Sequence, residues 1–119
     1  MALARGDLVT VALSGDYGKP RPALVVQDDA FMGLESVTVL LLTSELREAP
    51  LVRIAMQPSS ENGLQRASDV MIDKAATVPR SRLGARIGLA DAETLRAVDL
   101  ALTRFLGLGP SALAHGSNR

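Results

Sequence analysis

The hydrophobic pattern over the first two thirds of the chain predicts β-strands. Residues 7–13 alternate inward aliphatic side chains with an outward Thr10, which is typical of a strand. Apolar runs predict four more strands, at residues 21–27, 36–43, 51–56 and 68–78. The run at 36–43 is almost entirely apolar, which favours a central place in the sheet. Gly, Pro and Ser clusters at 14–20 and 57–64 mark connections, so the first strands are expected to pair antiparallel.

One amphipathic helix is predicted near the C-terminal end, over residues 92–106. Its apolar stripe has spacings of three and four and consists of Leu95, Val98, Leu102 and Phe105. Asp91 is a good N-cap, and Gly107 followed by Pro110 ends the helix. Residues 83–89 are expected to form a short strand or turn under it. The predicted fold is mainly β (α+β): a strongly bent antiparallel sheet closed into a small barrel, with one main C-terminal helix.

Length and composition indicate a single domain. The chain has 119 residues, of which 47% are hydrophobic and 22% charged, as in ordinary globular proteins. We expect one domain over residues 1–108, followed by a flexible tail of small and polar residues at 109–119. No apolar run approaches the roughly 20 residues of a membrane span, and residues 1–10 lack a signal-peptide core. A cytoplasmic location is therefore expected.

Several kinds of chemistry find no support in the sequence. There is no cysteine, and the one histidine, His115, lies in the predicted tail. Phosphate-binding Gly-rich motifs are absent and the acidic residues are scattered, so neither a metal nor a cofactor is expected. The net charge is zero, with 13 basic and 13 acidic residues, although residues 66–86 hold a small basic excess.

The strand ends supply the best candidate chemistry. Arg21 lies where a loop rich in Gly, Pro and charge enters an apolar strand, and its planar guanidinium suits phosphate oxygens. If the strands at 21–27 and 36–43 pair antiparallel, Arg21 becomes a neighbour of Thr43. With Tyr17 and Lys19 in the adjoining loop, this pair suits a phosphate and a stacked base. The alternative is a surface arginine beside a threonine whose hydroxyl bonds to local backbone.

Several motifs together resemble one family, the MazF/PemK toxins of bacterial toxin-antitoxin pairs. The strand Arg21-Pro22-Ala23-Leu24-Val25-Val26-Gln27 resembles the Arg-Pro-(Ala/Val)-Leu-Val signature of that family. Other matching segments follow in the order and spacing of the family, at residues 5–9, 41–44, 62–64, 68–73, 82–84 and 87–88. The resemblance covers about residues 4–108 and implies an SH3-like, CcdB-PemK-type antiparallel β-barrel.

The resemblance also implies an activity and partners. Members of the MazF/PemK family are homodimeric endoribonucleases that cut single-stranded RNA at short sequences without a metal. The ribose 2'-hydroxyl attacks the adjacent phosphorus, leaving a 2',3'-cyclic phosphate and a 5'-hydroxyl. Arg21 matches the catalytic arginine of the family and Thr43 its catalytic threonine. A cognate antitoxin is implied as a second partner, covering the RNA groove.

Residues around this pair are expected to contact RNA: Asp16, Tyr17, Gly18, Lys19, Ser44, Asp73 and Lys74. Many family members have a longer first loop with a Glu before the arginine, and this chain has Asp16 and Tyr17 there. The sequence leaves open the general base, the RNA sequence that is cut and the identity of the antitoxin.

Two other functions are alternatives. The CcdB toxins are similar in fold and inhibit DNA gyrase through C-terminal residues, but residues 116–119 here offer no apolar wedge. An inactive barrel that only binds antitoxin is the second alternative, because a neutral chain lacks the usual electrostatic attraction for RNA.

Overall fold

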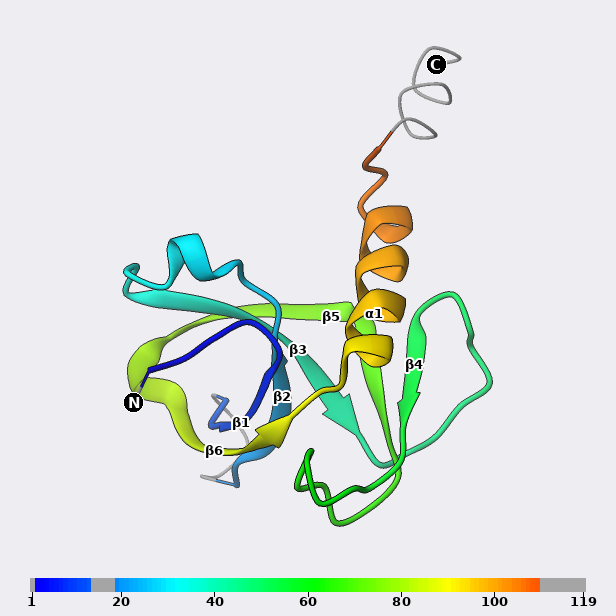
Figure 1. Cartoon of the computed structure of the whole chain (residues 1–119), viewed down its shortest axis with the longest axis horizontal. Helices are drawn as coiled ribbons and strands as arrows, with labels where there is room; N and C mark the ends of the chain where they lie inside the picture. Colours follow the sequence, from blue (N-terminus) through cyan, green and yellow to red (C-terminus); the bar gives the residue numbers. More distant parts are fainter. Residues whose placement is uncertain (1, 14–18, 110–119) are drawn as a thin grey trace.

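The computed structural model describes residues 2–13 and 19–109 (Figure 1). Within these residues the strands are β1 (Asp7–Val11), β2 (Arg21–Val25), β3 (Ser36–Thr43), β4 (Arg53–Met56), β5 (Ser68–Pro79) and β6 (Leu83–Leu89). Two 3-10 turns, η1 (Asp29–Phe31) and η2 (Arg80–Arg82), and one helix, α1 (Ala92–Phe105), complete the described fold. The predicted tail beyond residue 109, including His115, lies outside the described residues.

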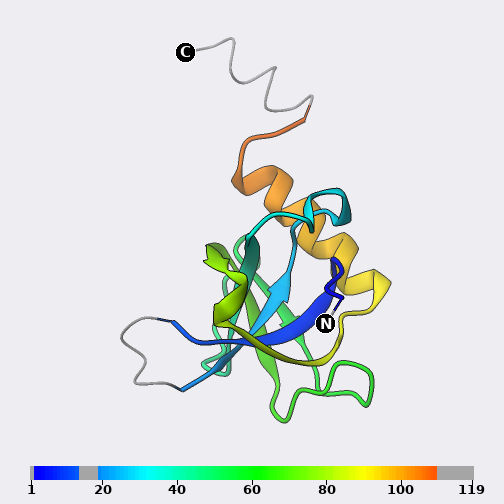
Figure 2. The same ribbon diagram turned by 90° about the vertical axis from the view of Figure 1, so that its left-hand side faces the viewer.

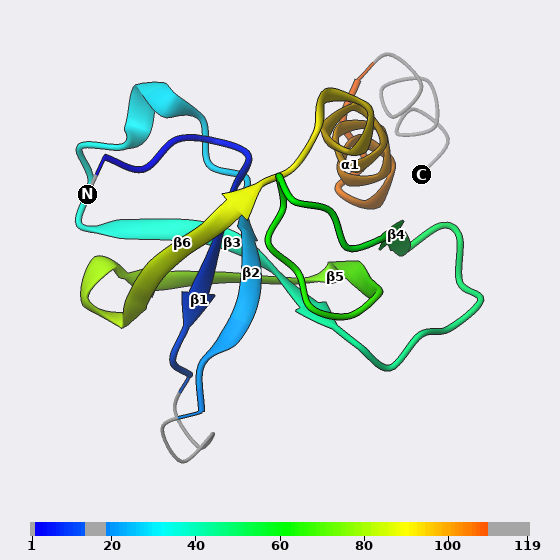
Figure 3. The ribbon, with the colours of Figure 1, turned by 60° about the horizontal axis from the view of Figure 1, so that its bottom comes forward.

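The strands form one antiparallel sheet in the order β4-β5-β3-β2-β1-β6 (Figure 3). The predicted pairing of the first three strands is confirmed, and β3 has the predicted bounds. The expectation of a closed barrel is wrong for the described residues, because β4 and β6 are the two edges of the sheet. The connection from β4 to β5 lies along β6 instead, where the Leu89 amide donates to the Glu61 carbonyl at 2.8 Å.

Residues 83–89 form a full edge strand rather than a short strand or turn. This strand pairs with β1, with Asp7 opposite Leu89 and Val11 opposite Leu83. β4 is shorter than predicted because residues before it form a turn, in which the Val52 and Arg53 amides both donate to the Ala49 carbonyl.

The sheet is buried on both faces, which explains its long apolar runs. One core lies under α1 and includes Leu8, Leu24, Leu40, Leu42, Val98 and Ala101. The second core lies on the opposite face and is built mainly from valines: Val9, Val11, Val25, Val37, Val39 and Val78. Each fully buried Leu or Val stabilises the fold by about 1.5–3 kcal/mol.

A bulge divides β5 into two halves. Its register against β3 shifts between Leu40, which faces Ala75, and Leu42, which faces Val70. The Ile72 amide, within the bulge, donates to the Val52 carbonyl beside β4. Because the bulge adds an odd number of residues, the alternation of the strand changes faces there. β5 thereby bends from one part of the sheet to the other.

The helix packs against β4 and β5, and its C-terminal end extends past the sheet (Figures 1 and 2). The predicted cap is confirmed, since the Asp91 carboxylate accepts from the Thr94 amide at 2.7 Å. This hydrogen bond lowers the pKa of Asp91 below its ordinary value. Gly107 follows the helix with φ of 68°. Among the described residues no helix has the length and apolar character needed to cross a membrane.

Candidate active site

The strand register brings Arg21 and Thr43 together. In the β2–β3 pair Ala23 faces Leu41, and continuing this register by two residues sets Arg21 opposite Thr43. Arg21 is also paired with Val11 of β1, and Thr43 with Asp69 of β5. Both residues therefore occupy paired positions at one end of the central strands.

Both residues line one cleft of about 620 Å³. The ends of the central strands contribute Thr10, Arg21, Pro22, Leu42, Thr43, Ser44 and Glu45. The facing wall comes from the β4–β5 connection, the start of β5 and β6, through Gly63, Leu64, Gln65, Arg66, Ser68 and Ile87. Within the described lining, the charged residues are two arginines and one carboxylate, namely Arg21, Arg66 and Glu45. Such a lining suits a phosphate-bearing ligand.

The wall of the cleft is organised by Asn62, a buried side chain. Its Oδ1 accepts from the Ser59 amide at 3.0 Å and the Leu64 amide at 2.9 Å, and its Nδ2 donates to the Gln57 carbonyl at 2.8 Å. Gly63 and Gly88 allow this loop to touch β6, since a Cβ on Gly88 would lie 2.3 Å from the Asn62 carbonyl carbon. One buried amide side chain and the close contacts of two glycines thus fix the wall.

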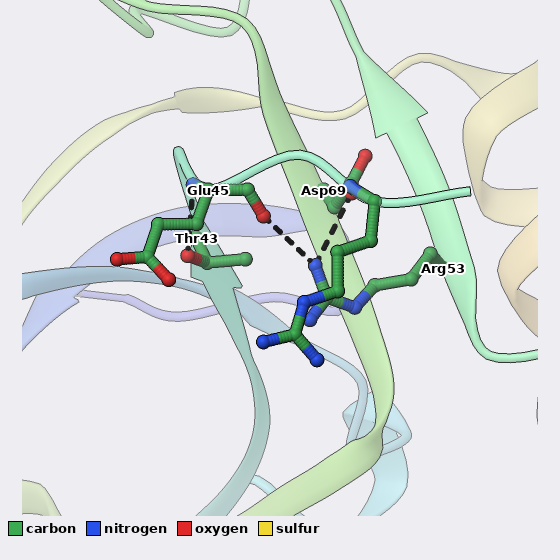
Figure 4. A network of polar contacts seen from close by, with 5 residues as sticks. Thr43, Glu45, Arg53 and Asp69 are labelled. Atoms are coloured by element: carbon green, nitrogen blue, oxygen red, sulfur yellow. Dashed lines mark hydrogen bonds and ion pairs between the residues drawn. The ribbon is translucent and has the colours of Figure 1, made fainter. Parts of the chain in front are cut away.

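Within the described part of the chain, the Thr43 hydroxyl forms one hydrogen bond. Its Oγ1 accepts from the Glu45 amide at 3.1 Å (Figure 4). This is the local backbone bond expected in the alternative interpretation, in which Arg21 is a surface arginine beside Thr43. Because the oxygen acts as the acceptor in it, the hydroxyl proton can still be donated to a ligand in the cleft.

A buried ion pair lies behind this turn. Arg53 Nη1 donates to Asp69 Oδ2 at 3.2 Å and to the Glu45 carbonyl at 3.1 Å (Figure 4). Asp69 Oδ2 also accepts from the Arg47 amide at 3.1 Å. The chain that leaves β3 is therefore anchored to β4 and β5 immediately after Thr43.

The predicted site residues fall into three groups. The structure brings Arg21, Thr43 and Ser44 into the cleft. Lys19 is exposed next to Pro20, which lines the cleft, whereas Asp73 and Lys74 are exposed on β5 and do not line it. The remaining three predicted residues, Asp16, Tyr17 and Gly18, lie outside the described residues. No group of three or more potential metal-ligating side chains occurs in the described part of the chain.

Comparison with known proteins assigns the chain to a family. The model of a family described as PemK-like, MazF-like toxin of type II toxin-antitoxin system matches residues 4–106. The chain belongs to this family. The resemblance found in the sequence motifs is thereby confirmed.

Relatives of this MazF-like chain carry consistent names. It is 48% identical over 108 residues to the probable endoribonuclease MazF of Mycolicibacterium smegmatis, covering 89% of this chain and 98% of that protein. It is 27% identical to endoribonuclease EndoA of Bacillus subtilis over 113 residues, covering 91% and 97%. A solved endoribonuclease in complex with its cognate antitoxin, from Mycobacterial species, has a TM-score of 0.77 and 28% identity, with 91% and 98% covered.

These comparisons support the predicted fold class and the endoribonuclease interpretation over the gyrase inhibitor. Sequence reasoning missed several residues of the site, namely Glu45, Arg53, Asn62, Arg66 and Asp69. Arg66 gave a signal as part of the basic excess at residues 66–86, and Asn62 and Asp69 lie in segments that match the family motifs. The others depend on contacts between distant segments.

Proposed function

We propose that this MazF-like toxin cleaves single-stranded RNA in the cleft beside β2 and β3, without a metal ion. The ribose 2'-hydroxyl attacks the adjacent phosphorus and leaves a 2',3'-cyclic phosphate and a 5'-hydroxyl. The observation that carries this proposal is the register that sets Arg21 opposite Thr43 in one cleft. The endoribonuclease names of the relatives support it.

Arg21 is assigned to charge stabilisation. Negative charge grows on the phosphorane as the new bond forms, and a guanidinium offers two parallel donors to its oxygens. Arginine stays protonated at any working pH, so it is a poor proton acceptor. The Thr43 hydroxyl donates a hydrogen bond to a nonbridging or leaving oxygen, an orientation supported by the bond that its oxygen accepts from the Glu45 amide.

RNA contacts beyond the reacting phosphate are proposed for three groups of residues. Ser44 and Arg66 line the cleft, and Lys19 is exposed next to it. Asp16, Tyr17 and Gly18 stay in the proposal because their loop leads directly to Arg21. Asp73 and Lys74 belong to it only where the RNA runs past the cleft or where a second copy of the chain supplies them.

The proposed partners follow from the family. The solved relative with a cognate antitoxin supports an antitoxin partner for this chain. We further propose a homodimer in the cytoplasm. A small open reading frame beside this gene is the expected source of the antitoxin.

The test is cleavage of defined RNA by the purified chain in EDTA, with sequencing of both new ends. Cyclic phosphate ends, and no cleavage of RNA carrying 2'-O-methyl groups, are expected. Arg21→Ala is expected to lower the cleavage rate about 10²–10³-fold, while Arg104→Ala, an exposed arginine on α1, keeps it. Cleavage by Arg21→Ala at the native rate would contradict the role of Arg21.

A further inference from the structure

Glu45 is the one carboxylate among the described residues that line the cleft. It lies two residues after Thr43, where the chain leaves β3, and its side chain is exposed. The other charged residues of the lining are Arg21 from β2 and Arg66 from the β4–β5 connection. Among the described lining residues, one anionic side chain therefore faces a cleft whose other side chains are basic or neutral.

The backbone of Glu45 is held on both sides. Its amide donates to Thr43 Oγ1 at 3.1 Å, and its carbonyl accepts from Arg53 Nη1 at 3.1 Å. Arg53 is itself fixed by the buried carboxylate of Asp69. The Cα of Glu45 is thus anchored to β3 through one peptide group and to β4 through the next, so its side chain starts from a defined point.

The side chain leaves this point in a definite direction. In Figure 4 the Glu45 carboxylate extends away from Arg53 and Asp69, on the side where the Thr43 hydroxyl lies. The ion pair behind the turn therefore neutralises Asp69 and Arg53 with each other. The Glu45 carboxylate lies on the side of the cleft.

The proposed reaction needs a proton acceptor for the ribose 2'-hydroxyl. Arg21 and Arg66 have no acceptor atoms, and the Thr43 hydroxyl, an alcohol, is a far weaker base than a carboxylate. We propose that the Glu45 carboxylate is this general base. The assignment rests on the proposed function and adds to it the residue that starts the reaction.

The step balances without a further reactant. A Glu45 carboxylate oxygen takes the proton of the 2'-hydroxyl while the O2'–P bond forms. The P–O5' bond then breaks, and the leaving 5'-oxygen takes a proton from water. Glu45 afterwards returns its proton to the solvent, so the enzyme is regenerated.

The test compares Glu45→Gln with Glu48→Gln in single-turnover cleavage of one RNA oligonucleotide. Glu48 is exposed on the same connection and lies outside the cleft, so it controls for the loss of one negative charge. Glu45→Gln is expected to lower the rate about 10²–10⁴-fold, with Glu45→Asp in between and Glu48→Gln near the native rate. Thermal unfolding should be equal for all variants.

The pH profile gives the second measurement. In the native protein the rate should rise with pH as the general base loses its proton. This rise should be absent in Glu45→Gln and present in Glu48→Gln. An unchanged rate and profile in Glu45→Gln overturns the assignment while Arg21→Ala stays inactive, which leaves the proposed function standing. A changed RNA sequence preference at the native rate also overturns it, because Glu45 would then read a base.

Discussion

Arg53 Nη1 lies 3.2 Å from Asp69 Oδ2, and the two side chains are only 12% and 5% exposed. The pair joins β4 to β5 and lies directly behind the turn that follows Thr43. The same two side chains bond the Glu45 carbonyl and the Arg47 amide. A buried ion pair thus connects the stability of the sheet with the geometry of the cleft.

Asp69→Ala should therefore affect both stability and activity. Removing the carboxylate leaves Arg53 buried without its charge partner, which is expected to cost about 3–5 kcal/mol of unfolding free energy. Urea denaturation measures this loss. Asp99→Ala is the control, because its ion pair with Arg5 is more exposed and should contribute less than about 1 kcal/mol. Equal stability of the two variants would contradict the structural role of Asp69.

Thr43→Val is expected to abolish the donated hydroxyl while keeping the shape of the side chain. The loss of one transition-state donor should lower the single-turnover cleavage rate about 10²–10³-fold. Thr43→Ser keeps the hydroxyl and should retain most of the activity. Native activity in the valine variant would show that the hydroxyl does not take part in the reaction.

Gly88→Ala tests the contact that fixes the wall of the cleft. An added Cβ would lie 2.3–2.4 Å from backbone atoms of Asn62 and Glu61, so the loop must move. We expect a loss of about 1–3 kcal/mol in unfolding free energy together with a higher KM for RNA. Gly33→Ala is the matched control, since nothing lies within 4 Å of its added Cβ. If both variants behave alike, the close approach of this loop to β6 is wrong.

The N-cap of α1 predicts a pH-dependent stability. Folding lowers the pKa of Asp91 through its hydrogen bond to the Thr94 amide, so the carboxylate contributes stability above its unfolded pKa of about 3.9. This contribution is lost as the pH falls through the lower folded pKa. The stability difference between the native chain and Asp91→Ala should therefore be full at about pH 6 and shrink below about pH 4. A difference independent of pH would contradict the charged cap.

The first three strands and the placement of Arg21 beside Thr43 were predictable because they follow from local patterns. The alternation of side chains predicts β1 to β3, and antiparallel order alone makes Arg21 a neighbour of Thr43. The bounds of β3 are those of its apolar run. For these residues, the alternation of apolar and polar side chains along the sequence already predicts most of what the structure shows.

The rest of the site depends on contacts between distant segments. The bulge that turns β5 from one core to the other leaves no mark in the composition of residues 71–74. Arg53 and Asp69 are unremarkable charges in the sequence, and only the β4–β5 register brings them together. The open sheet also depends on a contact between distant segments. The backbone of Glu61 bonds to β6, where the predicted closed barrel would need a strand.

The pairing of Arg21 with Val11 has a consequence for how such toxins diversify. The backbone of the arginine is fixed by the ladder between β1 and β2, so its place does not depend on the length of the connection that joins them. Insertions or deletions in that connection are expected to leave Arg21 where it is. Under the proposed function, changes in that connection are therefore expected to alter RNA contacts while Arg21 keeps its place.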